Sequence, residues 1–192
     1  MEKNKSKKQF RQDIKNKLFC LDNKEVVETG SIIMKKILDL KRFQKAKKVF
    51  TYIATKGEPN TLFLLKEILN KKEVYVPRCL DNDNITAIRI RSFKDLSKGK
   101  YGIAEPKPDL TELFHCDSES IILVPGIVFD EKGHRIGRGK GCYDRYLARQ
   151  KKKCPVWGIC FDFQILKLIP FDSWDIKMTG LITEKRTLLE IV

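Results

Sequence analysis

The first forty residues carry apolar side chains at the spacing of two amphipathic helices. The first stripe consists of Phe10, Ile14, Leu18 and Leu21. The second consists of Val26, Val27, Ile33, Met34, Ile37, Leu38 and Leu40. Asp22 and Asn23 lie between the stripes, and both types begin helices because their side chains accept hydrogen bonds from free backbone N–H groups. The pattern predicts two helices separated by a turn.

Beyond residue 48, short apolar runs alternate with helical stretches. We expect strands at residues 49–54, 74–76, 85–90, 121–124, 156–161 and 181–183, with Pro77 ending the second and the third half-exposed and antiparallel. We expect helices at residues 61–69, with Thr61 near the N-terminus, and at 143–152. Residues 92–119 are loop-rich. This alternation predicts an α/β fold, a layered structure with a mostly parallel central sheet flanked by helices.

The length of 192 residues fits a single domain over residues 1–192. No apolar run approaches the ~20 residues of a membrane span, so no association with a membrane is expected. The first ten residues lack the apolar stretch of a secretory signal. We therefore expect a cytoplasmic protein.

The net charge of +14 is concentrated in two blocks. Residues 1–48 carry fifteen Lys or Arg against six Asp or Glu, and residues 132–153 carry nine against one. Blocks of one sign attract anions, although solvated helix faces also carry them. Aromatic residues are not interleaved with these blocks as stacking platforms, so nucleic acid is not the expected partner.

Six cysteines are scattered without a C-x-x-C pair, and two histidines stand apart from them. This spacing does not predict a zinc site. We expect the cysteines to be free thiols, most of them small core residues.

Residues 125–145 contain a glycine-rich segment with Gly137, Gly139 and Gly141 alternating with Arg138 and Lys140. Glycines let backbone N–H groups converge on an anion, and arginine forms paired hydrogen bonds with phosphate oxygens. The segment is neither a P-loop nor a Rossmann fingerprint. It predicts a phosphate-binding loop ahead of a helix. The spacing leaves open whether Asp144, just downstream, caps this helix or binds magnesium.

The segment from Pro125 to Asp144 closely resembles the signature P-G-x-x-F-D-x-x-G-x-R-[LI]-G-R-G-x-G-x-Y-D of the 5-formyltetrahydrofolate cyclo-ligase family. Further matches follow in order along the chain: Lys7-x-x-x-Arg11, Glu58-x-x-Thr61, Val76-Pro77-Arg78, Gly102-Ile-Ala-Glu-Pro106 and Phe161-Asp-Phe-Gln164. Two positions depart from the family pattern. Cys142 stands where a tyrosine is usual, which puts substrate affinity in question, and Thr179 stands where many relatives are acidic.

The resemblance implies ATP-dependent cyclisation of 5-formyltetrahydrofolate to 5,10-methenyltetrahydrofolate, with Mg²⁺ as cofactor and release of ADP and phosphate. In that reaction the formyl oxygen attacks the γ-phosphate, and the second folate nitrogen then closes the ring. The resemblance also implies a fold similar to the sugar-phosphate isomerase and coenzyme A transferase superfamily. The enzyme is expected to be a monomer, and its positive charge suits the anionic tail of folates, including polyglutamylated forms.

The resemblance also implies roles for individual residues. Arg138 and Lys140 would act on the transferring phosphoryl group as catalytic residues, and Asp144 and Asp175 would hold magnesium. The implied ATP-binding residues are Lys7, Arg11, Arg135, Ile136, Gly137, Arg138, Gly139, Lys140, Gly141, Cys142 and Tyr143. The implied folate-binding residues are Ile53, Glu58, Arg138, Gly139, Lys140, Gly141 and Cys142.

Two other classes of function remain open from the residues alone. A nucleic-acid-binding protein would use the basic blocks, and a sugar-phosphate isomerase or acyl-CoA transferase would share only the fold. An isomerase or transferase would need neither ATP nor Lys7 and Arg11 one turn apart on a first helix.

Overall fold

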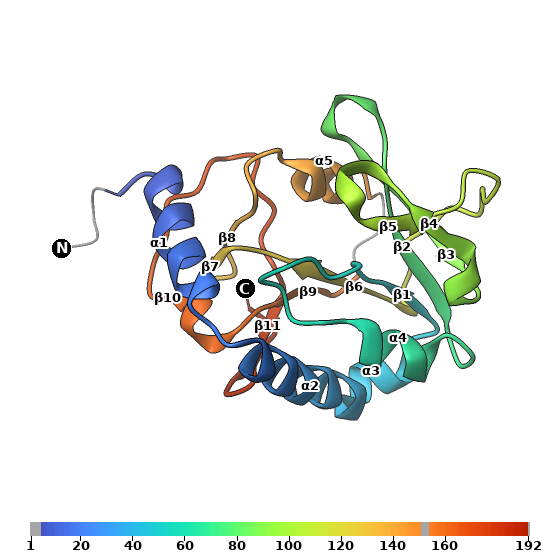
Figure 1. Cartoon of the computed structure of the whole chain (residues 1–192), viewed down its shortest axis with the longest axis horizontal. Coiled ribbons are helices and arrows are strands. Elements are labelled where there is room, and N and C mark those ends of the chain that lie inside the picture. The colour runs from blue at the N-terminus through green and yellow to red at the C-terminus, as the bar shows by residue number, and fades with distance from the viewer. Residues whose placement is uncertain (1–4, 151–153, 192) are drawn as a thin grey trace.

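The computed structural model describes residues 5–150 and 154–191. Its centre is a seven-stranded sheet, flanked by helices on both faces (Figure 1). In spatial order the strands are β12 (Thr187–Leu189), β11 (Gly180–Ile182), β9 (Val156–Ile159), β6 (Ser120–Pro125), β1 (Lys48–Phe50), β2 (Glu73–Cys79) and β3 (Ile85–Ile90). The inner pairs are parallel, and only the edge strands β3 and β12 run antiparallel to their neighbours. The prediction of a mostly parallel sheet in an α/β fold is confirmed.

Helices α2 (Asn23–Asp39), α3 (Lys41–Lys45) and α4 (Leu62–Ile68) cover one face of the sheet, and α5 (Cys142–Ala148) covers the other (Figure 1). On the first face, Ile33 and Ile37 of α2 pack with Leu64 of α4 against apolar side chains of the sheet. On the second face, Tyr146 of α5 packs edge-on against Phe50 of β1, with 5.0 Å between ring centroids. Two apolar layers therefore enclose the sheet.

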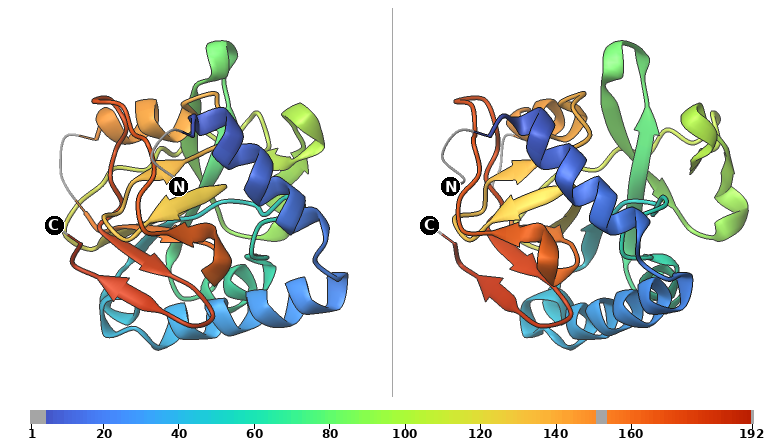
Figure 2. Two further views of the ribbon diagram at one scale, coloured as in Figure 1. Left: turned by 90° about the vertical axis from the view of Figure 1, so that its left-hand side faces the viewer. Right: turned by 60° about the vertical axis from the view of Figure 1, so that its left-hand side comes forward.

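Helix α1 (Lys7–Phe19) lies apart from the main core, beside a small sheet of β10 (Ile165–Leu166), β7 (Val128–Asp130) and β8 (Arg135–Ile136) (Figure 2). Its buried residues Phe10 and Ile14 pack against Val128 and Ile136. Ser6 caps the helix through a reciprocal pair of hydrogen bonds with Gln9, so Lys7 is the first helical residue. This packing brings the start of α1 to the glycine-rich segment that follows β8.

The remaining elements are short. They are the hairpin strands β4 (Leu96–Lys98) and β5 (Ala104–Pro106), and the 3₁₀ turns η1 (Asp81–Asp83), η2 (Phe93–Asp95), η3 (Lys100–Gly102) and η4 (Asp162–Gln164). No helix among the described residues is long and apolar enough to cross a membrane.

Several predicted boundaries differ from the structure. Strand β1 ends at Phe50 rather than at residue 54, because the chain leaves the sheet there to line a cleft. Pro77 does not end β2: beyond Tyr75 the strand has lost β1 as a neighbour, so the missing N–H of Pro77 breaks no hydrogen bond on that side. Helix α5 stops at Ala148, and residues 151–152 of the predicted helix lie outside the described part.

The expectation that all six cysteines are free thiols is wrong. Cys116 and Cys154 form a disulfide, with their Cα atoms 6.3 Å apart. Cys116 precedes β6 and Cys154 precedes β9, and these two strands are parallel neighbours that start at the same end of the sheet. The other four cysteines are free, but only Cys160 is fully buried.

Candidate active site

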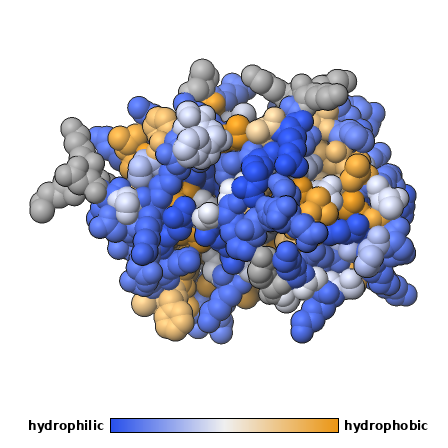
Figure 3. All heavy atoms as spheres, turned by 90° about the horizontal axis from the view of Figure 1, so that it is seen from above, coloured by the Kyte–Doolittle hydropathy of each residue, from blue (hydrophilic) through white to orange (hydrophobic). Residues whose placement is uncertain are grey.

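A cleft of about 790 Å³ opens beyond the carboxyl ends of β1 and β6, where parallel α/β sheets bind ligands. Every residue that the sequence assigned to the site lines this cleft, from Lys7 on α1 to Asp175 in the loop before β11. The surface above the sheet is mostly hydrophilic, with scattered hydrophobic patches (Figure 3). The residues that line the cleft come from segments that are far apart in sequence.

The loop from Gly137 to Gly141 forms the centre of the cleft, between β8 and α5. Gly139 has a φ of +106° and Gly141 a φ of +64°, in the left-handed region that other residues avoid. Any other residue would have a strained backbone at either position, which explains why both positions are glycine. The turn leaves Arg138 and Lys140 on the cleft wall on either side of Gly139.

Two cations of α1 face this loop from one side. Arg11 Nε donates a hydrogen bond of 2.8 Å to the carbonyl of Gly137. Lys7 Nζ donates to Asp172 Oδ2 at 2.7 Å and also to Asp175. Partial burial alone would lower the pKa of Lys7, but the hydrogen bonds and charges of Asp172 and Asp175 outweigh it and raise that pKa above its usual value. Lys7 therefore stays positively charged at neutral pH.

Arg138 crosses the cleft to the loop after β1. Its Nη2 donates to Glu58 Oε1 at 2.9 Å and to the hydroxyl of Thr55. The backbone N–H of Thr55 donates to the other oxygen of Glu58 at 2.9 Å. The Arg138 side chain is 51% exposed whereas that of Glu58 is 10% exposed, so the pair joins an exposed cation to a largely buried carboxylate.

Two carboxylates lie on the α1 side of the cleft. Asp144 Oδ2 accepts a hydrogen bond of 2.9 Å from Arg135 Nη2, and its Oδ1 accepts a long one of 3.4 Å from the backbone N–H of Ile176. This contact brings Asp144 beside the residue that follows Asp175. Of the two roles that the sequence left open for Asp144, its side chain shows no capping of α5.

Asp144 and Asp175 would serve as two carboxylate ligands of a partly hydrated magnesium ion, not as a complete protein coordination shell. Among the described residues, no group of three or more potential ligands is arranged to hold a metal. Magnesium bound to a nucleotide usually keeps several waters and takes only one or two carboxylates. Asp144 and Asp175 supply that number of oxygen donors on the wall of the phosphate loop.

The opposite end of the cleft is mostly apolar. Ile53 lies there with Pro77, Ile85 and Ile103, and Cys142 is half-buried at its edge. Tyr143 is also half-buried and stacks on Phe50, and desolvation raises the pKa of its hydroxyl far above the usual value. The cleft thus has a charged end at α1 and a mostly apolar end at β2 and β5, toward which Lys140 extends through its ion pair of 2.7 Å with Asp83, in the turn before β3.

Sequence reasoning missed several residues that line the cleft, among them Thr55, Glu105, Asp172 and Trp174. Glu105 belongs to the matched motif Gly102-Ile-Ala-Glu-Pro106, but the motif match gave it no functional role. Trp174 is 69% exposed, which is unusual for so large an apolar ring. Asp172 had no local signal, because its partner Lys7 is 165 residues away in sequence.

Comparison with known proteins gives one consistent result. A sequence model described as "5-formyltetrahydrofolate cyclo-ligase family" matches residues 3–184. The chain is 29% identical to a probable 5-formyltetrahydrofolate cyclo-ligase of Schizosaccharomyces pombe, over 86% of this chain and 89% of that protein. It is 27% identical to the 5-formyltetrahydrofolate cyclo-ligase of Mus musculus, over 94% and 95%.

Among solved structures, the fold is similar to that of the 5,10-methenyltetrahydrofolate synthetase of Aquifex aeolicus. The TM-score is 0.84 at 33% identity, and the match covers 95% of this chain and 92% of the other. The glycine loop, its flanking cations and the match over nearly the whole sequence agree. The chain belongs to the 5-formyltetrahydrofolate cyclo-ligase family.

Proposed function

We propose that the protein is an ATP- and magnesium-dependent 5-formyltetrahydrofolate cyclo-ligase, forming 5,10-methenyltetrahydrofolate, ADP and phosphate through a phosphorylated formyl oxygen. The observation that carries the proposal is the convergence of a glycine-rich anion loop, two cations of α1 and the buried carboxylate Glu58 on one cleft. Membership of the cyclo-ligase family supports the same activity.

The charged end of the cleft suits the nucleotide. The backbone N–H groups of Gly137 to Gly141, with Arg135, Ile136, Cys142 and Tyr143 around them, would surround the triphosphate. Lys7 and Arg11 would approach it from α1. Both cations already bind oxygen atoms in the structure, so phosphate oxygens would replace partners of the same chemical kind.

The apolar end suits the folate ring, with Ile53 packing on it and Glu58 accepting hydrogen bonds from its N–H groups. Before Glu58 can do so, its oxygen must be released by Arg138. A phosphate group beside Arg138 provides an alternative anion for the guanidinium. ATP binding would therefore free Glu58 for the folate, which couples the two substrates.

The chemistry needs position and charge rather than a protein nucleophile. The formyl oxygen of the substrate forms a bond to the γ-phosphorus while the bond to the bridging oxygen of ADP breaks. The second folate nitrogen then attacks the formyl carbon and releases its proton to water, and phosphate leaves with the former formyl oxygen. Arg138 and Lys140 would stabilise the negative charge on the transferring group. Magnesium, held by Asp144 and Asp175, would neutralise charge on the phosphates when bound.

The experiment is direct. The purified protein is mixed at neutral pH with 5-formyltetrahydrofolate, ATP and magnesium chloride, and the absorbance of the methenyl product is followed together with ADP. We expect one ADP per methenyl product, and no product when ATP or the divalent ion is left out. Product formation at an equal rate without nucleotide would contradict the proposal.

Other expectations from the sequence stay predictions: a single domain over residues 1–192, a monomer, a cytoplasmic location, a preference for polyglutamylated folates and the wider superfamily. A single cooperative unfolding transition of the purified enzyme tests the first of these, and sedimentation tests the second. A comparison of mono- and polyglutamylated substrates tests the fourth.

A further inference from the structure

Glu105, on β5, is a buried carboxylate in the wall of the apolar end of the cleft. Glu105 is only 6% exposed, yet it lines the cleft together with Pro77, Ile85 and Ile103. A carboxylate so far from water is costly unless hydrogen bonds satisfy it. Its surroundings therefore need an explanation.

The hydrogen bonds of Glu105 are incomplete. Its Oε2 accepts the backbone N–H of Cys79 at 3.0 Å. Its Oε1 is buried and has no hydrogen-bond partner among the described residues. The Cys79 thiol is also within hydrogen-bonding reach, and burial together with Glu105 raises its pKa to about 11, so it stays a neutral thiol. Buried polar atoms without a partner are rare in folded proteins, and one at a cleft wall indicates a ligand atom that would satisfy it.

The hairpin of β4 and β5 holds this carboxylate in place. Gly99, at its turn, has no side chain, and a Cβ there would lie 2.5 Å from Cγ of Glu105. Arg78 of β2 donates to the carbonyl of Pro106 at 3.3 Å, which fastens β5 beside β2. Glu105 is thus positioned by its neighbours and not left free to turn to solvent.

The residues around Glu105 define the kind of ligand group that would bind to its Oε1. An ionised carboxylate only accepts hydrogen bonds, so the ligand atom at Oε1 must be a donor. Pro77, Ile85 and Ile103 favour a flat apolar body carrying that donor at its edge. The bicyclic ring of a folate has this form, with N–H groups around an otherwise apolar plane. Glu58 cannot serve all of them, because Thr55 still holds one of its oxygens after ATP has drawn Arg138 away from the other.

We propose that Glu105 is a second folate-binding carboxylate, whose unpartnered Oε1 accepts a hydrogen bond from an N–H group of the bicyclic ring. The inference rests on the proposed function, since it takes the folate as the occupant of this end of the cleft. In that case, Glu58 and Glu105 hold different N–H groups of one ring, and Glu105 contributes to recognition of the folate and not of ATP.

The test is a pair of matched variants, Glu105→Gln and Glu112→Gln. Glutamine keeps the size and one acceptor oxygen but loses the charge, so the KM for 5-formyltetrahydrofolate in Glu105→Gln should rise about 10- to 100-fold. The KM for ATP should change less than about three-fold. Glu112 pairs with Arg89 and Arg91 outside the cleft, and its variant should keep both constants. Melting curves of both variants show whether each is folded.

Two further variants keep the carboxylate and change only its position. Glu105→Asp shortens the side chain, and Gly99→Ala pushes against it. Both should raise the KM for the folate while leaving that for ATP nearly unchanged, and they serve as the test if Glu105→Gln does not fold.

The outcomes separate the two levels of the proposal. A wild-type enzyme that forms no methenyl product with ATP and magnesium would overturn the proposed function itself. An active wild type combined with unchanged folate KM in Glu105→Gln and Glu105→Asp would overturn only the role of Glu105. Equal changes of both KM values, with a lower melting temperature, would show that Glu105 merely holds β5 to β2.

Discussion

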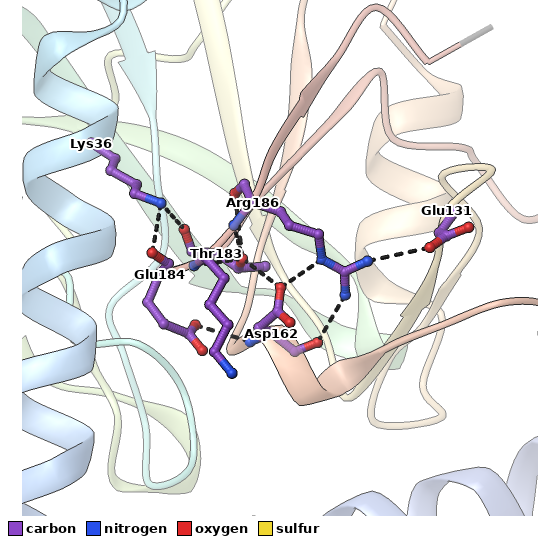
Figure 4. Close-up of polar contacts among 7 residues, drawn as sticks. Lys36, Glu131, Asp162, Thr183, Glu184 and Arg186 are labelled. Atoms are coloured by element: carbon purple, nitrogen blue, oxygen red, sulfur yellow. Dashed lines mark hydrogen bonds and ion pairs between the residues drawn. The ribbon is translucent and has the colours of Figure 1, made fainter.

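Two charged networks of this protein resemble one another in composition but differ in what surrounds them. The cleft network consists of Lys7, Glu58, Arg135, Arg138, Asp144, Asp172 and Asp175. The C-terminal network, shown in Figure 4, consists of Lys36, Glu131, Asp162, Thr183, Glu184 and Arg186. Residues of the first line the cleft, and none of the second does.

The C-terminal network is closed upon itself. Asp162 Oδ1 accepts hydrogen bonds from Arg186 Nε at 2.7 Å and from the hydroxyl of Thr183 at 2.9 Å. Lys36 of α2 donates to the backbone carbonyl of Glu184 at 2.6 Å. These bonds tie α2 and the η4 turn to the hairpin of β11 and β12. In the folded protein these groups bind one another and not a ligand, so the network contributes to stability.

In the cleft network the cations stand where an anionic ligand would meet them. Lys7, Arg135 and Arg138 hold carboxylates in the structure, but they also line the cleft beside the glycine loop. The Arg135 side chain is only 4% exposed and that of Lys7 21%, so each needs an anionic partner, and a phosphate that replaces a carboxylate supplies one. The comparison indicates that ion pairs of similar geometry serve binding in one region and stability in the other.

The largest effect is expected for Arg138→Ala. Loss of a cation that stabilises charge on the transferring phosphoryl group should lower turnover about 10²- to 10³-fold and weaken ATP binding less. Steady-state kinetics and calorimetric titration with ATP measure the two effects. Arg149→Ala is the control, because Arg149 follows α5 and binds Asn84 outside the cleft. Turnover within a few-fold of the wild type would remove Arg138 from the catalytic role.

Glu58→Gln should raise the KM for the folate about 10- to 100-fold and leave that for ATP nearly unchanged, because the amide loses about 1–3 kcal/mol of charge-assisted hydrogen bonding. The double variant with Arg138→Ala sharpens the comparison. At saturating ATP, where we expect the phosphate to have drawn Arg138 away from Glu58 already, the two single effects on the folate KM should add. Equal effects of Glu58→Gln on both substrates would mean that Glu58 organises the loop instead.

Arg186→Ala should lower the free energy of unfolding by about 1–3 kcal/mol, since Asp162 keeps its burial but loses its charged partner. Both KM values and turnover should remain those of the wild type. Urea unfolding and steady-state kinetics on one preparation test the two statements together. A catalytic defect without a loss of stability would break the distinction between the networks.

Cys142 should react with a thiol reagent several-fold faster than Cys160, and magnesium with ATP should protect it. Cys142 is half-buried on the cleft wall, whereas Cys160 is fully buried in the core. Exposed Cys20 serves as the fast control that nucleotide leaves unchanged. Mass spectrometry quantifies each site, and a labelling rate of Cys142 equal to that of Cys160 would place its thiol in the core.

The smallest effect concerns pH. Burial alone would raise the pKa of Asp162, but hydrogen bonds from Arg186 and Thr183 outweigh it and lower that pKa below 3.8. A carboxyl with a lowered pKa in the folded state stabilises it above the unfolded pKa, and this contribution is lost as the pH falls through the folded value. Wild type should therefore be more stable than Asp162→Asn at about pH 6, with the difference shrinking below about pH 4. Urea unfolding across this range tests it, and a constant difference would contradict it.

The sequence alone determined the helices of the first forty residues, the mostly parallel sheet and the glycine-rich loop, because helical spacing, apolar runs and glycine positions are local properties of a chain. The other cleft residues were named only through the resemblance to the cyclo-ligase family. The sequence also placed Lys7 and Arg11 on one helical face. It missed the short strands β4, β5, β7, β8, β10 and β12, the first two within residues 92–119 that were expected to be loop-rich, because two or three residues are too few for a periodic pattern.

Only the tertiary structure decided the partners. Lys7 meets Asp172 from 165 residues away, and Cys116 meets Cys154 because β6 and β9 are neighbours. The unpartnered oxygen of Glu105 likewise follows from the packing of β5 beside β2. Such contacts depend on strand order and on how layers pack, and local spacing carries no information about either.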